Sequence, residues 1–195
     1  MNTPIIETEG YHGSREIRLD ARFLKENKVF LLGEINPESA IELTQKLIYL
    51  QNEPKVSTVK LYINSPGGEI NSGLMIYDVL QAMTKDVEMY CIGMAASMGA
   101  LILASGKKGH RHILPHSRTM IHEPLIQNGI GGSATSIRHI SESIMDSKKM
   151  VNAILARHVG RPIEEIDKAT SYDNYMNAQE SVEFGICDDI TTDIF

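Results

Sequence analysis

The side chain best suited to nucleophilic chemistry is Ser97, in the run of small residues from Gly93 to Ala100. Apolar segments flank this run, which predicts a buried strand, a tight turn and a helix that begins at Ser97. Free backbone N–H groups and the helix dipole at such a position stabilise an alkoxide and the oxyanion it generates. The alternative is that Ser97 only caps the helix. The run also departs from the G-x-S-x-G nucleophile elbow, because Ala95 replaces its first glycine.

Acyl transfer by a serine also requires donors for the oxyanion. The backbone N–H of Met98 follows the candidate nucleophile directly, and a second donor could come from the turn at Gly67 and Gly68. Two adjacent glycines leave room for an approaching carbonyl, because no side chain blocks it. An ordinary glycine turn is the alternative interpretation.

Among seven histidines, His122 is the best candidate for the general base. It closes a predicted strand, and Glu123-Pro124 keeps the following chain extended, so that the imidazole can reach over a site. The alternative is that His122 has no catalytic role and only makes structural hydrogen bonds at the end of the strand. The candidate acid is Asp173, the only carboxylate in the irregular stretch 169–176, although a helix-capping role would explain it equally well. The other histidines are placed in an N-terminal arm, on a short strand, in a tight turn and on a long helix: His12, His110, His112, His116, His139 and His158.

Repeated strand–turn–helix units must position these residues. The predicted strands are 29–32, 58–63, 87–92, 111–114, 118–121 and 186–190, and the predicted helices are 36–50, 69–83, 97–104, 133–158, 163–168 and 177–185. This alternation predicts a single α/β domain with mainly parallel strands, in which sites gather where strands end and helices begin. Residues 1–20 are polar and are interpreted as an arm that orders against a partner. The helix 133–158, about 39 Å long, should project and need a partner.

Composition excludes several classes of function. The net charge of −6 and the lack of a basic block argue against nucleic-acid binding. Cys91 and Cys187 share no metal-ligand spacing and are interpreted as buried thiols in a reducing compartment. The N-terminus lacks a signal-peptide pattern, and no apolar run approaches the roughly 20 residues of a membrane span. These features predict a cytoplasmic protein.

Four motifs in order resemble the proteolytic subunit of the Clp protease, ClpP, from about Asp20 to Ile190. They are Asn64-Ser65-Pro66-Gly67-Gly68, the run Gly93–Ala100, Met120-Ile121-His122-Glu123-Pro124, and Asp173 followed by Ala178 and Glu183-Phe184-Gly185. The resemblance implies that Ser97, His122 and Asp173 are catalytic, and that Gly68 and Met98 donate backbone N–H groups to the oxyanion. It implies no metal and no cofactor.

The resemblance also implies a fold and partners. The family's fold is the ClpP/crotonase-type superhelix of β-β-α units, here with residues 1–20 as an axial arm, about 125–158 as a protruding handle and 127–132 as the strand that binds substrate. Its members assemble into heptameric rings stacked as tetradecamers. Inside this chamber they hydrolyse unfolded polypeptides fed by a hexameric Clp-type ATPase, for protein quality control and turnover. No membrane or nucleic-acid partner is implied.

Several positions depart from the family's pattern. Ser171 and Tyr172 stand where an acidic residue and an arginine commonly pair across the ring–ring contact, which predicts weaker or differently coupled stacking. On the face where the ATPase docks, His112 stands where the family usually has an aromatic residue, and Met83 stands where it often has another. A titratable ring in an apolar pocket would weaken docking. The loop 125–132 is about one residue longer than usual. These departures suggest a divergent paralogue that needs a second ClpP-type subunit.

Two alternatives remain at this point. The chain could be a catalytically weak ring subunit that acts mainly through assembly with a second ClpP-type subunit. It could also be a crotonase-type acyl-CoA enzyme, which would share the two-glycine oxyanion turn but would not need Ser97, His122 and Asp173 together.

Overall fold

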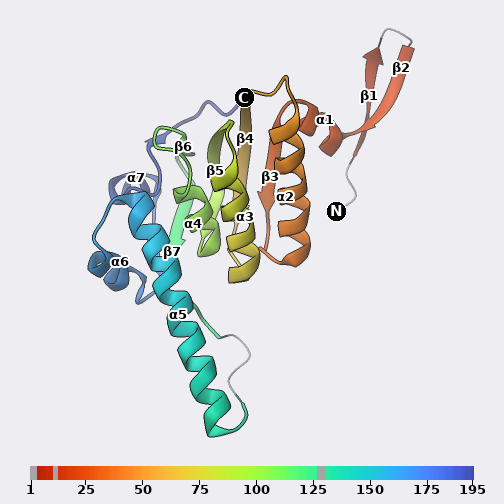
Figure 1. The fold of residues 1–195 in the computed structure, drawn as a ribbon. Coiled ribbons are helices and arrows are strands. Elements are labelled where there is room, and N and C mark those ends of the chain that lie inside the picture. Colours follow the sequence, from red (N-terminus) through yellow and green to blue (C-terminus); the bar gives the residue numbers. More distant parts are fainter. Residues whose placement is uncertain (1–3, 11–12, 127–130) are drawn as a thin grey trace.

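The structure, a computed structural model, describes residues 4–10, 13–126 and 131–195 (Figure 1). The strands are β1 (Ile5–Gly10), β2 (Gly13–Arg18), β3 (Lys28–Leu32), β4 (Thr58–Ser65), β5 (Asp86–Ala96), β6 (Arg111–Ile113), β7 (Arg118–Ile121), β8 (Asn174–Met176) and β9 (Asp189–Ile190). The helices are α1 (Leu19–Lys25), α2 (Pro37–Asn52), α3 (Ile70–Ala82), α4 (Met98–Ala104), α5 (Ala134–Val159), α6 (Ile163–Thr170) and α7 (Ala178–Phe184).

The main sheet has the strand order β3-β4-β5-β6-β9, and all these neighbours are parallel. The long strand β5 changes partner along its length. Met89–Cys91 pairs with β6, whereas Met94–Ala96 pairs with β7, which in turn pairs antiparallel with β8. The predicted mixed α/β fold with mainly parallel strands is therefore confirmed. The change of partner brings the ends of β5, β7 and β8 together.

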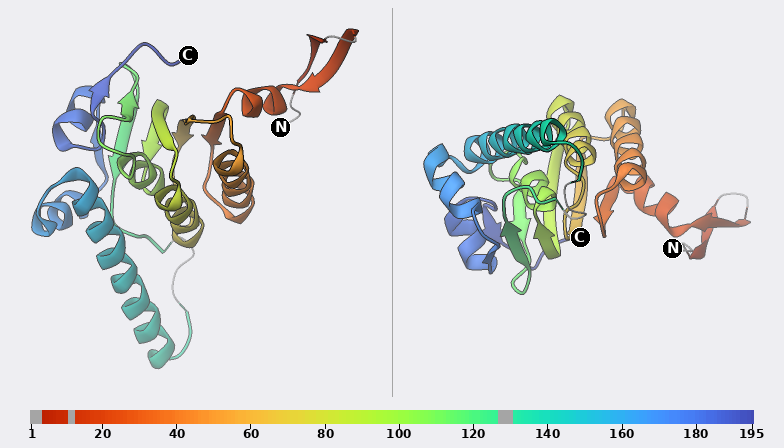
Figure 2. Two further views of the ribbon diagram at one scale, coloured as in Figure 1. Left: turned by 45° about the horizontal axis from the view of Figure 1, so that its top comes forward. Right: turned by 90° about the horizontal axis from the view of Figure 1, so that it is seen from below.

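Two parts extend from the body at different ends. The hairpin of β1 and β2 projects beyond α1, and the first half of α5 projects in the opposite direction (Figures 1 and 2). The predicted long helix is confirmed, and its buried residues, Val151, Asn152 and Leu155, all lie in its second half. The predicted substrate strand 127–132 and the loop 125–132 fall largely on residues outside those described. No helix in the described ranges is both long and apolar enough to cross a membrane.

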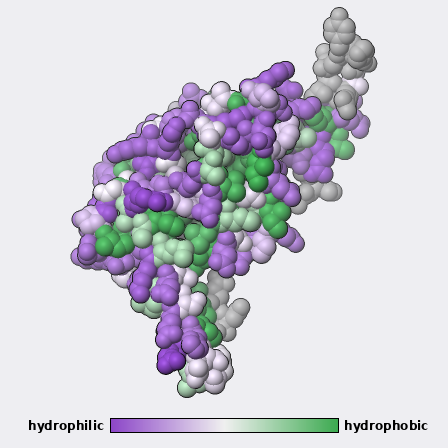
Figure 3. All heavy atoms as spheres, in the orientation of Figure 1, coloured by the Kyte–Doolittle hydropathy of each residue, from purple (hydrophilic) through white to green (hydrophobic). Residues whose placement is uncertain are grey.

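The surface carries apolar side chains as well as charged ones. Ile41, Ile48 and Tyr49 of α2 are about half exposed. Figure 3 shows hydrophobic residues between hydrophilic ones on the face that α2 and α3 form. Apolar groups exposed along one helix are typical of a surface that contacts another protein.

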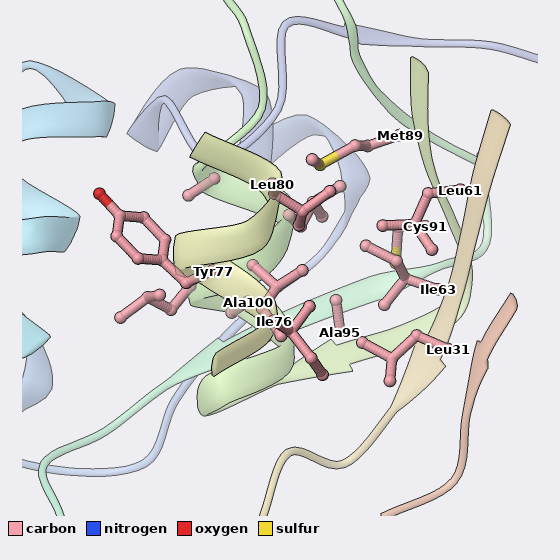
Figure 4. Close-up of a cluster of buried hydrophobic side chains, with 14 of the residues drawn as sticks. Leu31, Leu61, Ile63, Ile76, Tyr77, Leu80, Met89, Cys91, Ala95 and Ala100 are labelled. Atoms are coloured by element: carbon pink, nitrogen blue, oxygen red, sulfur yellow. The ribbon is translucent and has the colours of Figure 1, made fainter. Parts of the chain in front are cut away.

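The core lies between the main sheet and helices α2, α3 and α4 (Figure 4). Alternate residues of the strands meet the helices, because side chains alternate between the two faces of a sheet. The cluster drawn in Figure 4 includes Leu31, Leu61, Ile63, Met89 and Cys91 from strands, with Ile76, Leu80 and Ala100 from helices. All seven residues of α4 are buried. The small residues at its start therefore let it lie deep in the core, directly after Ser97.

Two predicted helix starts are confirmed in atomic detail. Asn36 caps α2 by accepting from the N–H of Ser39, and Pro37 occupies the first turn. Asn177 and Glu180 form the predicted capping box of α7, which ends at Gly185 in the left-handed region.

Three predictions of local structure are wrong. The N-terminal arm, expected to order only against a partner, forms an antiparallel hairpin of β1 and β2 within its described residues, and Leu19 begins α1. The predicted turn before Ser97 is strand, since β5 continues to Ala96. In the stretch 169–176 interpreted as irregular, α6 continues to Thr170 and residues 174–176 form β8.

The predicted strand 186–190 is shorter than expected. Ile186 and Cys187 donate their N–H groups to the carbonyl of Ser181, which completes the end of α7 instead of extending a sheet. Only Asp189 and Ile190 pair with β6.

Candidate active site

Ser97 lies between β5 and α4 in an unusual backbone conformation. Its φ is 53° and its ψ is −122°, a region that residues other than glycine rarely adopt. Hydrogen bonds hold both sides of the residue: its N–H donates to Met120 O over 2.8 Å, and its carbonyl accepts from Leu101 N over 3.1 Å. The side chain makes no capping hydrogen bond to α4. The interpretation of Ser97 as a simple cap is therefore wrong, and its hydroxyl points to another partner.

That partner is His122, directly after β7. The distance from Ser97 Oγ to His122 Nε2 is 3.0 Å, and the distance from His122 Nδ1 to Asp173 Oδ1 is 3.2 Å. The structure thus brings together all three side chains that the sequence analysis singled out. Since a carboxylate only accepts, Nδ1 must carry the proton, which leaves Nε2 free to accept from the serine hydroxyl.

Strand register explains why these residues meet. Met120 pairs with Ala96 in the parallel ladder of β5 and β7, so the chain directly after each strand lies close to the other. Ile121 pairs with Asn174 in the antiparallel ladder of β7 and β8, so His122 and Asp173 are the next opposite pair. A further hydrogen bond, from Glu123 N to Thr170 O over 2.7 Å, fixes this end of the ladder.

His122 and Asp173 differ in their exposure to solvent. The side chain of His122 is 16% exposed, whereas that of Asp173 is 61% exposed. Solvent screens an exposed carboxylate and lowers what it contributes to an ion pair. Solvent therefore screens Asp173 more strongly than it screens His122.

The glycine turn lies directly against Ser97. A Cβ on Gly67 would lie 2.7 Å from Ser97 Cβ, and a Cβ on Gly68 would lie 2.1 Å from Ile35 O. Ile35 N donates to Gly67 O and Glu69 N donates to Ile35 O, each over 2.8 Å. The turn is thereby fixed as a short parallel bridge to the chain after β3.

Two backbone donors of this region stay unpaired. Within the described residues, the N–H groups of Gly68 and Met98 donate to no other group. Free N–H groups at a helix start and in a glycine turn can stabilise a negative charge.

A groove and a pocket meet at Ser97. The groove runs past His122 and is also lined by Gly68, Pro124 and Leu125. The pocket beside it has mainly apolar walls, which come from Ile70, Met98, Leu101, Ile121, Val151 and Leu155. An extended chain in the groove could place one apolar side chain in the pocket, next to the serine.

Other histidines lie in different surroundings. His112 stacks on Tyr90, with ring centroids 4.9 Å apart, and its two ring nitrogens contact Glu88 and Asp189, each over 2.7 Å. The expectation of an apolar environment for His112 is therefore wrong, since two carboxylates flank it. His158 contacts Tyr77 at 3.1 Å.

The sequence analysis missed two residues of the pocket, Asn152 and Thr170, and the bridge to Ile35. A signal for Asn152 was present, because it is a polar residue between Val151 and Leu155 on the apolar stripe of the long helix. Across the described ranges, no group of three or more His, Cys, Asp or Glu side chains is arranged as metal ligands would be.

Comparison with known families agrees with this geometry. Residues 11–193 match the model of a family described as Clp protease. The match spans nearly all of the chain and includes every residue of the site.

Proposed function

The chain belongs to the Clp protease family, and from that premise we propose that it is a serine endopeptidase whose catalytic residues are Ser97, His122 and Asp173. Members of this family are serine peptidases, which favours this activity over that of an acyl-CoA enzyme. The observation that carries the proposal is the contact of 3.0 Å between Ser97 Oγ and His122 Nε2.

In the proposed reaction, Ser97 Oγ attacks the peptide carbonyl while His122 Nε2 takes the hydroxyl proton. Asp173 accepts from His122 Nδ1 and stabilises the imidazolium that forms. The tetrahedral intermediate collapses when His122 returns the proton to the leaving amine, which leaves an acyl-serine. Water activated by the same imidazole then hydrolyses this ester and regenerates the serine.

The oxyanion of the intermediate would be held by the N–H groups of Gly68 and Met98. Both donors are unpaired among the described residues, so they need no rearrangement before the reaction. Loss of one such donor typically lowers kcat by about 10²–10³-fold.

The substrates proposed here are unfolded polypeptides, bound in extended form along the groove. Main-chain hydrogen bonds would supply most of the affinity, and side-chain selection would come from the pocket beside Ser97. We further propose that the protein works in the cytoplasm, in quality control and turnover, within stacked heptameric rings that a hexameric Clp-type ATPase feeds. The family match supports oligomeric assembly and ATPase partners in general.

A fluorophosphonate probe with mass spectrometry tests the activity directly. We expect labelling at Ser97, and loss of both labelling and hydrolysis of a fluorogenic peptide in Ser97→Ala. The variant Ser57→Ala, at an exposed position before β4, is the matched control and should behave as wild type. Undiminished hydrolysis by Ser97→Ala would refute the proposal.

The exposure of Asp173 favours a second candidate, a catalytically weak subunit that acts mainly through assembly with a second ClpP-type subunit. In that case the probe would label Ser97 slowly in the isolated protein and faster in a mixed assembly.

A further inference from the structure

The apolar pocket beside Ser97 contains one buried amide. Asn152 and Thr170 line it, and each is only 1% exposed. A buried polar group is costly unless it is hydrogen-bonded, so the bonds of this amide determine what it can do.

Three hydrogen bonds fix how the Asn152 amide is turned. Its Nδ2 donates to Asp167 Oδ1 over 2.7 Å and to Thr170 Oγ1 over 3.0 Å. The Thr170 hydroxyl donates its only proton to Ile166 O over 2.9 Å. It must therefore act as the acceptor in its hydrogen bond with the amide. Rotating the amide by half a turn would place its oxygen against the Asp167 carboxylate, which the repulsion between two acceptors disfavours.

The amide oxygen is left without a donor. In the described ranges, no group donates to Asn152 Oδ1, and yet no fully buried side-chain nitrogen or oxygen lacks a partner. Both statements hold only if Oδ1 borders open space. Since Asn152 is otherwise enclosed and lines the pocket, that space belongs to the pocket.

We propose that Asn152 is a specificity-determining residue that binds the substrate side chain on the acyl side of the cleaved bond. The proposal rests on the proposed function, since it assigns that side chain to the pocket. A side chain with an apolar stem and a hydrogen-bond donor at its tip, such as glutamine, satisfies both the apolar walls and the fixed oxygen. A methionine of the same length covers the oxygen without pairing it, and a glutamate brings a second acceptor against it.

Peptides that differ only at this position test the proposal. The substrates carry Gln, Met or Glu, which have nearly the same shape. In Asn152→Leu, we expect the ratio of kcat/KM for Gln to that for Met to fall about five- to tenfold from the wild-type ratio. An unchanged ratio would overturn the proposal.

Asp167→Asn is a second variant that leaves the pocket wall in place. Asp167 is exposed and acts only as a positioning residue, so this variant is expected to fold. An asparagine can donate as well as accept, which allows the Asn152 amide to turn. We expect the Gln-to-Met ratio to fall in this variant too, by about two- to fivefold, while kcat/KM for a peptide with Ala at this position stays the same.

Binding to Ser97→Ala by isothermal titration calorimetry separates this proposal from the proposed function. In Ser97→Ala, we expect the Gln peptide to bind with a lower Kd than the Met peptide. In Ser97→Ala/Asn152→Leu, we expect this difference in Kd to be smaller. If hydrolysis fails but this preference remains, the peptidase assignment is wrong and the role of Asn152 holds. Equal relative affinities in the two proteins would refute the role of Asn152, whatever the activity.

Discussion

At the scale of single residues, the site depends on a strained backbone and on what surrounds it. A positive φ at a non-glycine residue costs of order 1–3 kcal/mol and persists only where neighbouring structure imposes it. For Ser97, the hydrogen bonds to Met120 and Leu101 impose it, and Gly67 leaves the necessary space. The strain turns the hydroxyl away from the helix end and toward His122.

Gly67→Ala should damage this arrangement. The new Cβ would lie 2.7 Å from Ser97 Cβ and 2.6 Å from Ala96 O, so the turn or the serine must move. We expect a loss of about 1–3 kcal/mol in unfolding free energy and of at least about 10²-fold in kcat/KM, since catalysis is sensitive to displacements of 1 Å. Urea unfolding and peptide hydrolysis measure the two effects.

Gly109→Ala is the matched control for this variant. Its φ of 90° is almost that of Gly67, 89°, but its Cβ would have no neighbour within 4 Å. The backbone strain in this variant should lower the unfolding free energy by only roughly 1–2 kcal/mol and leave kcat/KM unchanged. Equal losses of activity in the two variants would contradict the steric explanation.

Asp173→Asn tests the third side chain of the site. The amide could donate to His122 Nδ1 and favour the wrong tautomer, so that Nε2 no longer accepts from Ser97. We expect kcat/KM to fall by about 10²–10⁴-fold while circular dichroism and assembly stay unchanged. If activity is retained, the exposed Asp173 does not take part, and the site works as a pair of Ser97 and His122.

At the scale of elements, the position of the site follows from ladders that no local sequence signal reveals. The strands β5 and β4 were predictable because their apolar runs are long enough to be read by periodicity. The strand β8 has three residues, and its partner β7 lies more than 50 positions earlier in the chain. Its formation depends on a long-range pairing, so only the folded chain shows it.

The same reasoning explains which site residues could be found. Ser97, His122 and Asp173 stand in distinctive local contexts, and their motifs resemble a family. Asn152 and Ile35 reach the site only because α5 packs beside α4 and because the glycine turn pairs with the chain after β3. The positive φ of Ser97 could likewise not be predicted from the sequence, because a serine at the start of a helix is typical of a cap.

A buried ion pair between Arg111 and Asp188 links β6 to the ends of several helices. Arg111, 3% exposed, contacts Asp188 and also donates to the carbonyls of Ala104, His158 and Gly185. Burial raises the pKa of Asp188, but the hydrogen bond and charge of Arg111 outweigh it, so that this pKa lies below its ordinary value.

Asp188→Asn should therefore be strongly destabilising. It leaves the Arg111 cation buried without its counter-charge, which typically costs about 3–5 kcal/mol. Because the folded-state pKa of Asp188 is lowered, its contribution is present above the unfolded value of about 3.9 and is lost as pH falls through the folded value. Urea unfolding of both proteins at pH 7 measures the effect, and a difference under about 1 kcal/mol would contradict it.

His112 predicts the opposite pH dependence. Burial lowers its pKa, but the hydrogen bonds and charges of Asp189 and Glu88 outweigh burial, so that the pKa lies above its ordinary value. The stabilisation is therefore fully present below the unfolded value of about 6.5 and is lost as pH rises through the folded value. The difference in unfolding free energy between wild type and His112→Gln should be constant at acidic pH and shrink as pH rises. A difference that grows with pH would show that His112 is not held as a cation.

At the scale of the whole molecule, the described chain has surfaces that a single copy does not cover. The projecting half of α5 exposes Ile137, Ile140 and Met145, each by at least 38%. A helix with exposed apolar side chains and few contacts to its own domain is stabilised by packing against another chain. This geometry agrees with the general oligomeric assembly of the family.

The proposed stacking of rings gives the last prediction. Tyr172 is 59% exposed, and the Ser171 hydroxyl donates only to Lys168 O of its own helix, so neither side chain is engaged elsewhere in the described structure. Ser171→Glu/Tyr172→Arg would supply the acidic residue and the arginine that the resemblance described above leads us to expect at these positions. If their absence weakens stacking, the double variant should shift the mass measured by light scattering from single rings toward stacked rings. The shift should diminish as salt increases, because the new pairs are exposed. Tyr172→Arg alone, which adds a cation without its partner, should leave the mass unchanged. A wild-type protein that is already fully stacked at low protein concentration would contradict the prediction, and would place the stability of the assembly in the apolar face of α5.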